Sequence, residues 1–475
     1  MRRMRIRRTT IFGAGAAVVL LVLSSTTGAI GASAGPGVLR QLPKALGCWV
    51  FKPADGCSVY SAPRELSHFA TPSIVSTALS SDGRNLYVAA NAGTNLIVAF
   101  GRAADGSLVP VKGPTGCILP LTSACEPPVY RQRQLSGLAL SPDGRNLYSI
   151  ADYRPVEAVQ AVVRLSGGGL RGAAPGVSCG SAKGVDAADR RHHCQYSVEL
   201  GAGPRALAVS PDGHEIYVAV GDRVVTLGRT PTGGVFLAAC LGPPAPALRG
   251  IPCEAARATT QASGIALSPD GRYAYVASAD GLAVAARNPR TGSLTQLAGP
   301  AGCVDATGAG GCTVGRAVSR STDPTRSGGS RVAISRDGRN VYLAAADGIA
   351  SFARDASTGD VTQLAGPAGC ITQTAGDGCA IGRSLAGIEG LKVSPDGLSV
   401  YAAAYSSRGL AILTRASTGA LVQPAGPTGC VNADASSGCA AGRAIGEADT
   451  VSVSPDSHSV YVGSLDAGLA IFRRG

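Results

Sequence analysis

The sequence predicts an all-β protein: a seven-bladed β-propeller with four antiparallel strands per blade and a ring closed by the N-terminal strand, which completes the last blade. Three observations predict this fold: a turn motif that recurs seven times, four short strand-like segments in each repeat, and a last repeat that lacks its fourth segment. The composition agrees, because 65 glycines and 29 prolines among 475 residues supply turns, while 45% hydrophobic and only 16% charged residues exclude wholesale disorder.

A turn of the type Ser-Pro-Asp-Gly, followed after three residues by Tyr-Val-Ala or a close variant, organises the chain. Its glycine, or Ser457 in the last repeat, recurs at intervals of 58 to 69 residues, which indicates an array of similar units. The turn aspartate can hydrogen-bond nearby backbone. Because an active site breaks symmetry and a turn device repeats, we interpret all seven as structural: Asp82, Asp143, Asp212, Asp270, Asp337, Asp396 and Asp456.

Each repeat divides into four strand-like segments joined by turns. In the fourth repeat they are 264–267, 273–278, 282–285 and 293–297. These segments are short, rich in β-forming residues and bounded by Asp-Gly or Thr-Gly turns. No stretch shows a sustained 3.6-residue apolar period, so we expect few helices.

The two ends of the repeat array predict how the ring closes. The last repeat stops after its third segment, 469–473, whereas residues 37–48 align without a gap on the fourth strand and following turn of another repeat, residues 292–303. The N-terminal strand therefore completes the seventh blade and removes the exposed edge that an open array would present.

The 14 cysteines fall into seven local pairs, each between a fourth strand and the first strand of the next blade. An even number in an exported chain indicates disulfides, and one pair per loop favours nearest-neighbour connectivity. The predicted disulfides are Cys48–Cys57, Cys117–Cys125, Cys179–Cys194, Cys240–Cys253, Cys303–Cys312, Cys370–Cys379 and Cys430–Cys439. No Cys-x-x-Cys pair exists, so we expect no metal, and the sequence indicates no other cofactor.

Residues 1–34 have the pattern of an export signal, and residues 35–475 form the predicted propeller domain. A head of five arginines without an acidic residue precedes the apolar stretch 11–23, and Ala32-Ser33-Ala34 resembles a cleavage site. Arg7-Arg8 weakly resembles a twin-arginine signal. We therefore expect a secreted or extracellular protein, with an uncleaved membrane anchor as the alternative.

The formal net charge of +12 comes mainly from arginines scattered along the chain. Nucleic-acid-binding proteins cluster basic residues and interleave aromatic ones, so we expect no nucleic-acid partner. An anionic cell-wall polymer is an open alternative, although the arginines also fit a bias toward Arg, Ala and Gly. We expect no membrane-spanning segment in the mature chain, and a monomer.

Residues that differ between repeats are the best candidates for a ligand site. Propeller ligands usually bind over the central channel, where loops enter the innermost strands; this is a fold-level analogy. Just before those strands, four repeats carry charged residues where the others carry Val75, Ser136 or Ser263. With nearby polar residues, the predicted ligand-binding set is Arg205, Arg331, Glu389, Asp449, Gln134, Gln261 and His68. It either binds a polar anion such as a sugar acid or forms a rim of charges that pair with one another.

With these units in view, the chain resembles the lactonase-like seven-bladed propellers, which group 6-phosphogluconolactonase and carboxymuconate-cyclase relatives with YVTN-repeat proteins. The resemblance covers residues 37–475 and implies the propeller fold. In the enzymes a Pro-Arg-His sequence enters a first strand and a glutamate follows a second strand. Here Gly203-Pro204-Arg205-Ala206 keeps the arginine but replaces the histidine, and Gly221 stands where the glutamate belongs.

The sequence therefore favours an exported, disulfide-stapled binding or scaffold module at the cell surface or outside the cell. The unknown ligand or protein partner is expected at the central channel. The alternative is a lactonase-like enzyme that hydrolyses or forms a lactone of a sugar acid or carboxylate, with Arg205 and Arg331 holding the anion and Glu389 or Asp449 as the base. Calcium-dependent adhesion, a third interpretation, lacks the D-x-D-x-D-G run of a calcium loop.

Overall fold

The computed structural model describes residues 38–51, 56–60, 72–91, 95–119, 124–127, 134–151, 158–172, 179–181, 200, 203–243, 251–319 and 330–475. The predicted export signal, His68 and Cys194, with its predicted disulfide to Cys179, lie outside these residues. No helix in the described part of the chain is long and apolar enough to cross a membrane.

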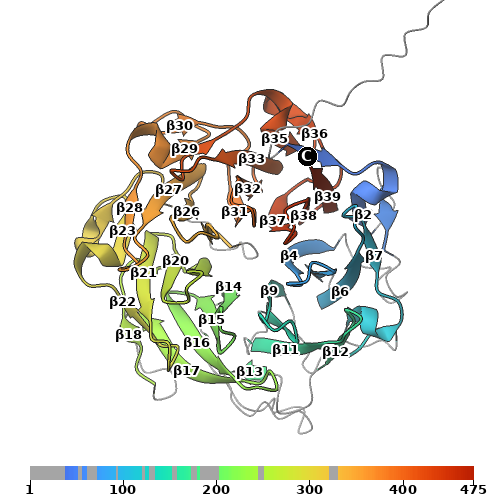
Figure 1. The fold of residues 1–475 in the computed structure, drawn as a ribbon, viewed down its shortest axis with the longest axis horizontal. Coiled ribbons are helices and arrows are strands. Elements are labelled where there is room, and N and C mark those ends of the chain that lie inside the picture. The colour runs from blue at the N-terminus through green and yellow to red at the C-terminus, as the bar shows by residue number, and fades with distance from the viewer. Residues whose placement is uncertain are drawn as a thin grey trace, which may run out of the picture. The chain divides into compact units, whose positions relative to one another are not determined.

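The protein is a seven-bladed β-propeller, as the sequence predicts: seven sheets follow one another in chain order around a common axis (Figure 1). We number the blades 1 to 7 by their innermost strands. These strands are β4 (Ser73–Leu79), β9 (Leu135–Leu140), β14 (Pro204–Val209), β19 (Gly264–Leu267), β25 (Val332–Ile334), β31 (Ile388–Val393) and β37 (Ala448–Val453).

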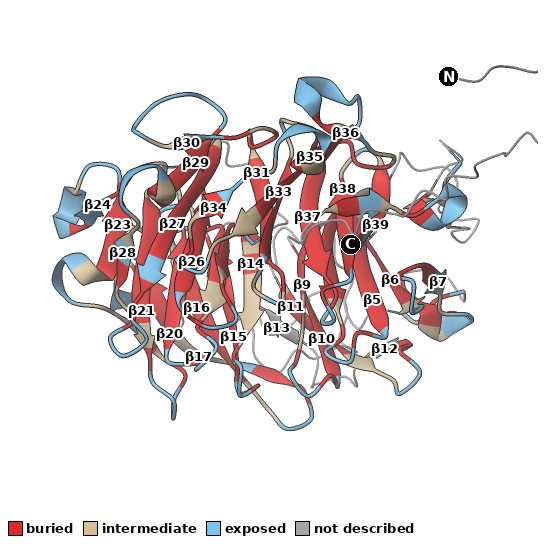
Figure 2. Cartoon of the chain, turned by 45° about the horizontal axis from the view of Figure 1, so that its top comes forward, coloured by how far each residue is buried: buried red, intermediate tan, exposed pale blue. Residues whose placement is uncertain are grey.

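The second and third strands of each blade are antiparallel and almost completely buried, as Figure 2 shows. The second strands are β5 (Asn85–Asn91), β10 (Asn146–Ala151), β15 (Glu215–Val220), β20 (Tyr273–Ala277), β26 (Asn340–Ala344), β32 (Ser399–Ala404) and β38 (Ser459–Ser464). The third strands are β6 (Asn95–Arg102), β11 (Ala158–Arg164), β16 (Arg223–Arg229), β21 (Gly281–Arg287), β27 (Gly348–Arg354), β33 (Gly409–Arg415) and β39 (Gly468–Arg474). Their apolar side chains pack between neighbouring blades, so that, for example, Tyr342 of β26 and Leu413 of β33 share one cluster.

The fourth position of most blades is more elaborate than a single strand, because a glycine- and proline-containing turn divides it. In blade 4 the 3-10 turn η4 (Gly299–Gly302) separates β22 (Leu294–Gln296) from β23 (Cys303–Asp305), and both halves pair with β21. Pro300 within the turn has no N–H to continue the ladder. The other fourth positions comprise β7 (Leu108–Pro110) with β8 (Cys117–Ile118), β12 (Leu170–Gly172) with β13 (Cys179–Ser181), the undivided β17 (Val235–Gly242), β28 (Val361–Gln363) with β29 (Cys370–Thr372), and β34 (Leu421–Val422) with β35 (Cys430–Asn432).

A short fifth strand runs parallel to the cysteine-bearing strand at the outer edge of five blades. These strands are β3 (Ser58–Val59), β18 (Glu254–Ala255), β24 (Thr313–Val314), β30 (Ala380–Ile381) and β36 (Ala440–Ala441). A disulfide ties each one to its neighbour, so the cross-link holds a strand too short to pair stably by itself. The sequence reasoning did not foresee this strand.

Six disulfides join described cysteines, and all six are among the predicted nearest-neighbour pairs. They are Cys48–Cys57, Cys117–Cys125, Cys240–Cys253, Cys303–Cys312, Cys370–Cys379 and Cys430–Cys439.

The ring closes in blade 7 with strands from the two ends of the repeat array, as predicted. β1 (Leu39–Gln41) and β2 (Cys48–Val50) pair antiparallel with β39, with Leu39 opposite Arg474 and Cys48 opposite Ala470. The Gly475 amide also donates to the Val38 carbonyl at 3.0 Å. The N-terminal segment therefore covers an edge that β39 would otherwise expose.

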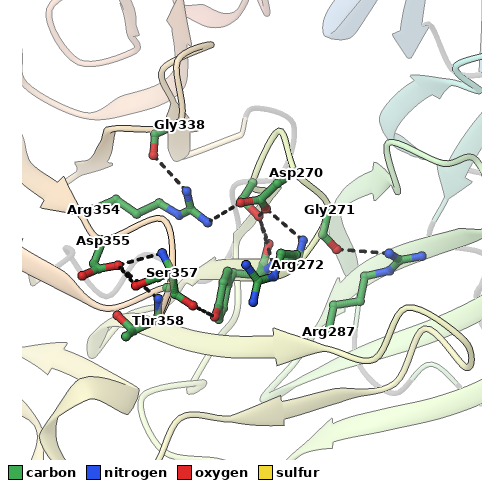
Figure 3. A network of polar contacts seen from close by, with 12 residues as sticks. Asp270, Gly271, Arg272, Arg287, Gly338, Arg354, Asp355, Ser357 and Thr358 are labelled. Atoms are coloured by element: carbon green, nitrogen blue, oxygen red, sulfur yellow. Dashed lines mark hydrogen bonds and ion pairs between the residues drawn. The ribbon is translucent and has the colours of Figure 1, made fainter.

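Each junction between blades is locked by an arginine that ends a third strand. Between blades 2 and 3, Arg229 donates from Nε to the Tyr148 hydroxyl at 2.7 Å and from Nη2 to Asp143 at 2.8 Å. Tyr148 in turn donates to the Gly233 carbonyl of blade 3 at 3.0 Å. Figure 3 shows Arg354 reaching Asp270 in the same way. The turn aspartates are thus inter-blade ion-pair partners as well as turn residues.

This lock recurs around the ring, with the arginine always reaching back to the preceding blade. The arginine–aspartate pairs are Arg102–Asp456, Arg164–Asp82, Arg229–Asp143, Arg287–Asp212, Arg354–Asp270, Arg415–Asp337 and Arg474–Asp396. In six junctions the tyrosine donates to a glycine carbonyl in the turn between the third and fourth strands of the next blade. At the seventh, Tyr401 has no partner among the described residues, because β39 and β1 are not joined by such a turn.

We expect Arg229→Ala to lower the free energy of unfolding by about 1–3 kcal/mol, because the buried Tyr148 hydroxyl loses the Arg229 hydrogen bond and the partly exposed Asp143 loses its ion pair. Denaturant-induced unfolding measures the loss. Arg290→Ala, which removes an exposed arginine from a turn of blade 4, serves as the control and is expected to change stability by less than about 0.5 kcal/mol. Equal effects of the two variants would contradict the lock.

We expect stability to fall between about pH 4 and pH 2. Partial burial alone would raise the pKa of each turn aspartate, but hydrogen bonds from the turn serine, a backbone amide and the arginine lower all seven values, that of Asp143 to about 2. The unfolded chain therefore binds these protons more tightly, and protonation favours unfolding. The melting temperature, measured from pH 7 to pH 2, is expected to be flat above pH 4 and to drop below it; Asp143→Asn should reduce the drop.

Candidate functional site

The seven innermost strands enclose a central channel with a cavity volume of about 710 Å³. Arg205 and Ser330 line it where the strands begin, an end that we call the loop mouth. Ser81, Arg336 and Pro395 line it at the opposite end, the turn mouth. Most of the lining residues are small or aliphatic, so the few charged ones stand out.

Three of the four charged candidates, Arg205, Glu389 and Asp449, occupy one structurally equivalent position, five residues before the turn serine of their repeat. In five blades a β-bulge lies at this position, where the innermost strand has one residue more than its partner. A bulge re-aims the side chain that it carries. The residues at this position, in blade order, are Val75, Ser136, Arg205, Ser263, Ser330, Glu389 and Asp449, and Arg331 lies one residue further along its repeat.

Several side chains at this position make contacts between blades. The Ser136 hydroxyl of blade 2 donates to the Pro204 carbonyl of blade 3 at 2.6 Å. Val75 of blade 1 packs with Leu135 in the apolar cluster shared with blade 2. The position therefore contributes to the packing of the ring, whatever else it does.

Of the four charged residues, the structure brings Arg331 and Glu389 together as an ion pair between blades 5 and 6. Arg331 is 2% exposed and Glu389 is 4% exposed. Both charges are shielded from water, so removing either residue would leave the other charge buried without a counter-ion.

The remaining candidates lie in different settings. Arg205 is partly exposed and lines the cavity, whereas Asp449 in β37 is fully buried. Gln134 and Gln261 have positive φ values of 120° and 51°, and their backbone amides donate to Asn95 and Asp222. The binding role predicted for these residues stays a prediction.

Some charges at the loop mouth pair with one another. Arg408 donates to Asp466 at 2.7 Å and lies 3.8 Å from Glu447, and the Glu447 amide donates to Asp466. Arg408 is 51% exposed. This arrangement matches the alternative that the sequence left open, a solvated rim of self-paired charges.

Lys392 in β31 is a lining residue that the sequence reasoning missed. Its side chain is accessible to solvent inside the channel. The protein that encloses the channel reduces the hydration of its amine and lowers the pKa. Aligning the seven repeats by their turn serines would have found it, because the residue two positions before that serine is alanine in five blades. The equivalent residues are Ala78, Ala139, Ala208, Ala266, Ala333, Lys392 and Ser452.

The charged residues that line the channel are Arg205, Arg336 and Lys392, and no carboxylate lines it within the described part of the chain. This arrangement suits an anion. General acid–base chemistry needs a titratable group within hydrogen-bond reach of the substrate, and the carboxylates predicted for that role, Glu389 and Asp449, are buried in the surrounding wall.

Comparison with known proteins agrees with the resemblance seen in the sequence. The family model described as "Lactonase, 7-bladed beta-propeller" matches residues 184–299, which include Arg205. A search of curated protein sequences found no match.

Among solved structures, a periplasmic gluconolactonase of Pseudomonas aeruginosa matches with 17% identity and a TM-score of 0.48, covering 80% of this chain and 93% of that one. A putative 6-phosphogluconolactonase of Bacteroides uniformis matches with 17% identity and a TM-score of 0.47, covering 73% of this chain and 83% of that one. A Lactobacillus plantarum protein matches with 16% identity and a TM-score of 0.48, covering 74% and 83%.

We expect Arg331→Met to lower the free energy of unfolding by about 3–5 kcal/mol, because Glu389 then remains buried without its partner. The double variant Arg331→Met, Glu389→Met is expected to recover most of that loss, since no buried charge is left. Denaturant-induced unfolding provides the measurement. The exposed pair gives the control: Arg408→Met should cost no more than about 1 kcal/mol. A double variant as unstable as the single one would be inconsistent with this interpretation.

Proposed function

We propose that the protein is an exported, disulfide-stapled binding module, with its ligand in the central channel of the propeller. The cationic lining of the channel carries this proposal: Arg205, Arg336 and Lys392 face a cavity of about 710 Å³ that no described carboxylate lines. A cavity of this size accommodates a small molecule.

Export is supported by two features of the chain. Residues 1–34 have the charge and apolar pattern of a secretion signal, and six disulfides fit an oxidising compartment. Both favour action at the cell surface or outside the cell.

A lactonase-like enzyme is the second candidate, and the family match over residues 184–299 favours it. Gly203-Pro204-Arg205 keeps the arginine of the enzymatic sequence, but Ala206 and Gly221 stand at the positions of the histidine and the glutamate. Glu389 is paired to Arg331 and Asp449 is fully buried, so neither of the two predicted bases lines the channel.

We expect purified mature protein to hydrolyse glucono-δ-lactone no faster than buffer does, because no carboxylate or histidine lines the described part of the channel. Release of protons at constant pH measures the reaction. Turnover by the wild type that is lost in Arg205→Ala would overturn the binding role in favour of the enzyme. Arg408→Ala is the matched control, since it removes an arginine from the rim rather than from the channel lining.

A further inference from the structure

One ring of side chains in the channel breaks the symmetry of the propeller. Five blades carry alanine at this level, blade 7 carries Ser452, and blade 6 carries Lys392. Alanine in five blades shows that neither the strand nor the packing requires a long side chain here. The lysine therefore needs an explanation other than the fold.

The strand geometry directs Lys392 toward blade 7. Gly390 lies two residues earlier on the same face of β31, and a methyl group there would come within 2.9 Å of the Asp449 carbonyl oxygen in β37. Lys392 and Ser452 both line the cavity from these neighbouring strands.

The Lys392 ammonium group has no counter-ion among the residues that the structure describes. No hydrogen bond or ion pair joins it to a described residue, and the other charged residues of the lining, Arg205 and Arg336, are also cations. Desolvation by the surrounding protein lowers the pKa of the Lys392 amine, and no described carboxylate offsets this effect. Lys392 therefore places a positive charge inside the channel that no described carboxylate of the lining offsets.

Hydroxyl groups line the channel wall at the junction of blades 7 and 1. The Thr77 hydroxyl lies 2.8 Å from the Ser452 hydroxyl and 3.3 Å from that of Thr450, and all three residues line the cavity. A channel that holds an ammonium group on one strand and hydroxyls elsewhere on its wall is suited to a ligand with an oxyanion group and further polar groups.

We infer that Lys392 holds the oxyanion group of a small ligand, a carboxylate, phosphate or sulfate, inside the channel whose wall also carries these hydroxyls. This inference rests on the proposed binding function and specifies the chemistry of its ligand. Lys392 supplies the charge, and the hydroxyl wall favours a ligand with further polar groups. Arg336 at the turn mouth adds a second positive charge along the path to the site.

Titration calorimetry with gluconate, inorganic phosphate and sulfate, each at constant ionic strength, tests the inference on the mature protein. At least one of the three is expected to bind the wild type, and Lys392→Ala should weaken that binding at least tenfold. Lys392→Arg, which keeps the charge, should retain it within a few-fold. Comparing gluconate with phosphate and sulfate identifies the oxyanion that the site prefers.

Lys392→Ala installs the residue that five other blades carry, so we expect it to fold like the wild type, with a matching melting temperature as the check. Lys44→Ala removes an equal charge from the exposed 3-10 turn η1 (Lys44–Gly47) and should bind as the wild type does. Unchanged affinity in Lys392→Ala, or no binding of any of the three anions to the wild type, would overturn the anion site. Neither result would contradict the proposed binding function. That function would be contradicted by lactone turnover that depends on Arg205.

Discussion

The ring is held by a repeated interaction between each third-strand arginine and the turn of the preceding blade. Arg229, for example, joins Asp143 and Tyr148 of the preceding blade and is itself largely buried. Because the interaction always reaches backward by one blade, every blade is positioned by its predecessor, and the channel takes its shape from seven such locks. The turn aspartate, the second-strand tyrosine and the strand-terminal arginine therefore form one structural unit.

A second set of arginines stabilises the outer edge of the last four blades. Arg316 follows the disulfide loop of blade 4, and its guanidinium donates to backbone carbonyls of blade 5, including Gly366 at 2.8 Å. Gln363 of blade 5 accepts from the Arg316 amide and donates to its carbonyl. The same pairing recurs as Arg257–Gln296, Arg383–Gln423 and Arg443–Gln41. Many of the scattered arginines that compositional bias would explain thus have defined structural partners.

The fold could be predicted from the sequence because its determinants are local and repeat seven times. The turn Ser-Pro-Asp-Gly sets the hairpins, and the displaced segment 37–48 shows where the ring closes. The fifth strands were missed, since two residues such as Thr313 and Val314 give no periodic signal and pair only because a disulfide holds them. The arginine locks were also missed, because their partners lie about 80 residues apart in sequence, as with Arg229 and Asp143, 86 residues apart.

The candidate site could be predicted less well. Comparing repeats found Arg205 and Arg331 as charged residues at the start of two innermost strands. Sequence gives no burial, however, so it could not distinguish an arginine in the channel lining from one paired inside the wall. The same comparison would have detected Lys392, three residues further along the innermost strand than Glu389. Residues that differ between repeats are the candidates for a ligand site. Their burial and contacts in the structure are needed to tell a residue that can contact a ligand from one that joins two blades.

Because both ends of the repeat array lie side by side in blade 7, the propeller is suited to circular permutation. Gly475 and Val38 are already hydrogen-bonded, so a short glycine-containing linker between them, with new termini placed in a turn of another blade, would preserve every strand. Such a permuted chain would give Tyr401 the carbonyl acceptor that its six counterparts have. New termini in the turn between the third and fourth strands of another blade would move the incomplete lock to the junction with the blade before it.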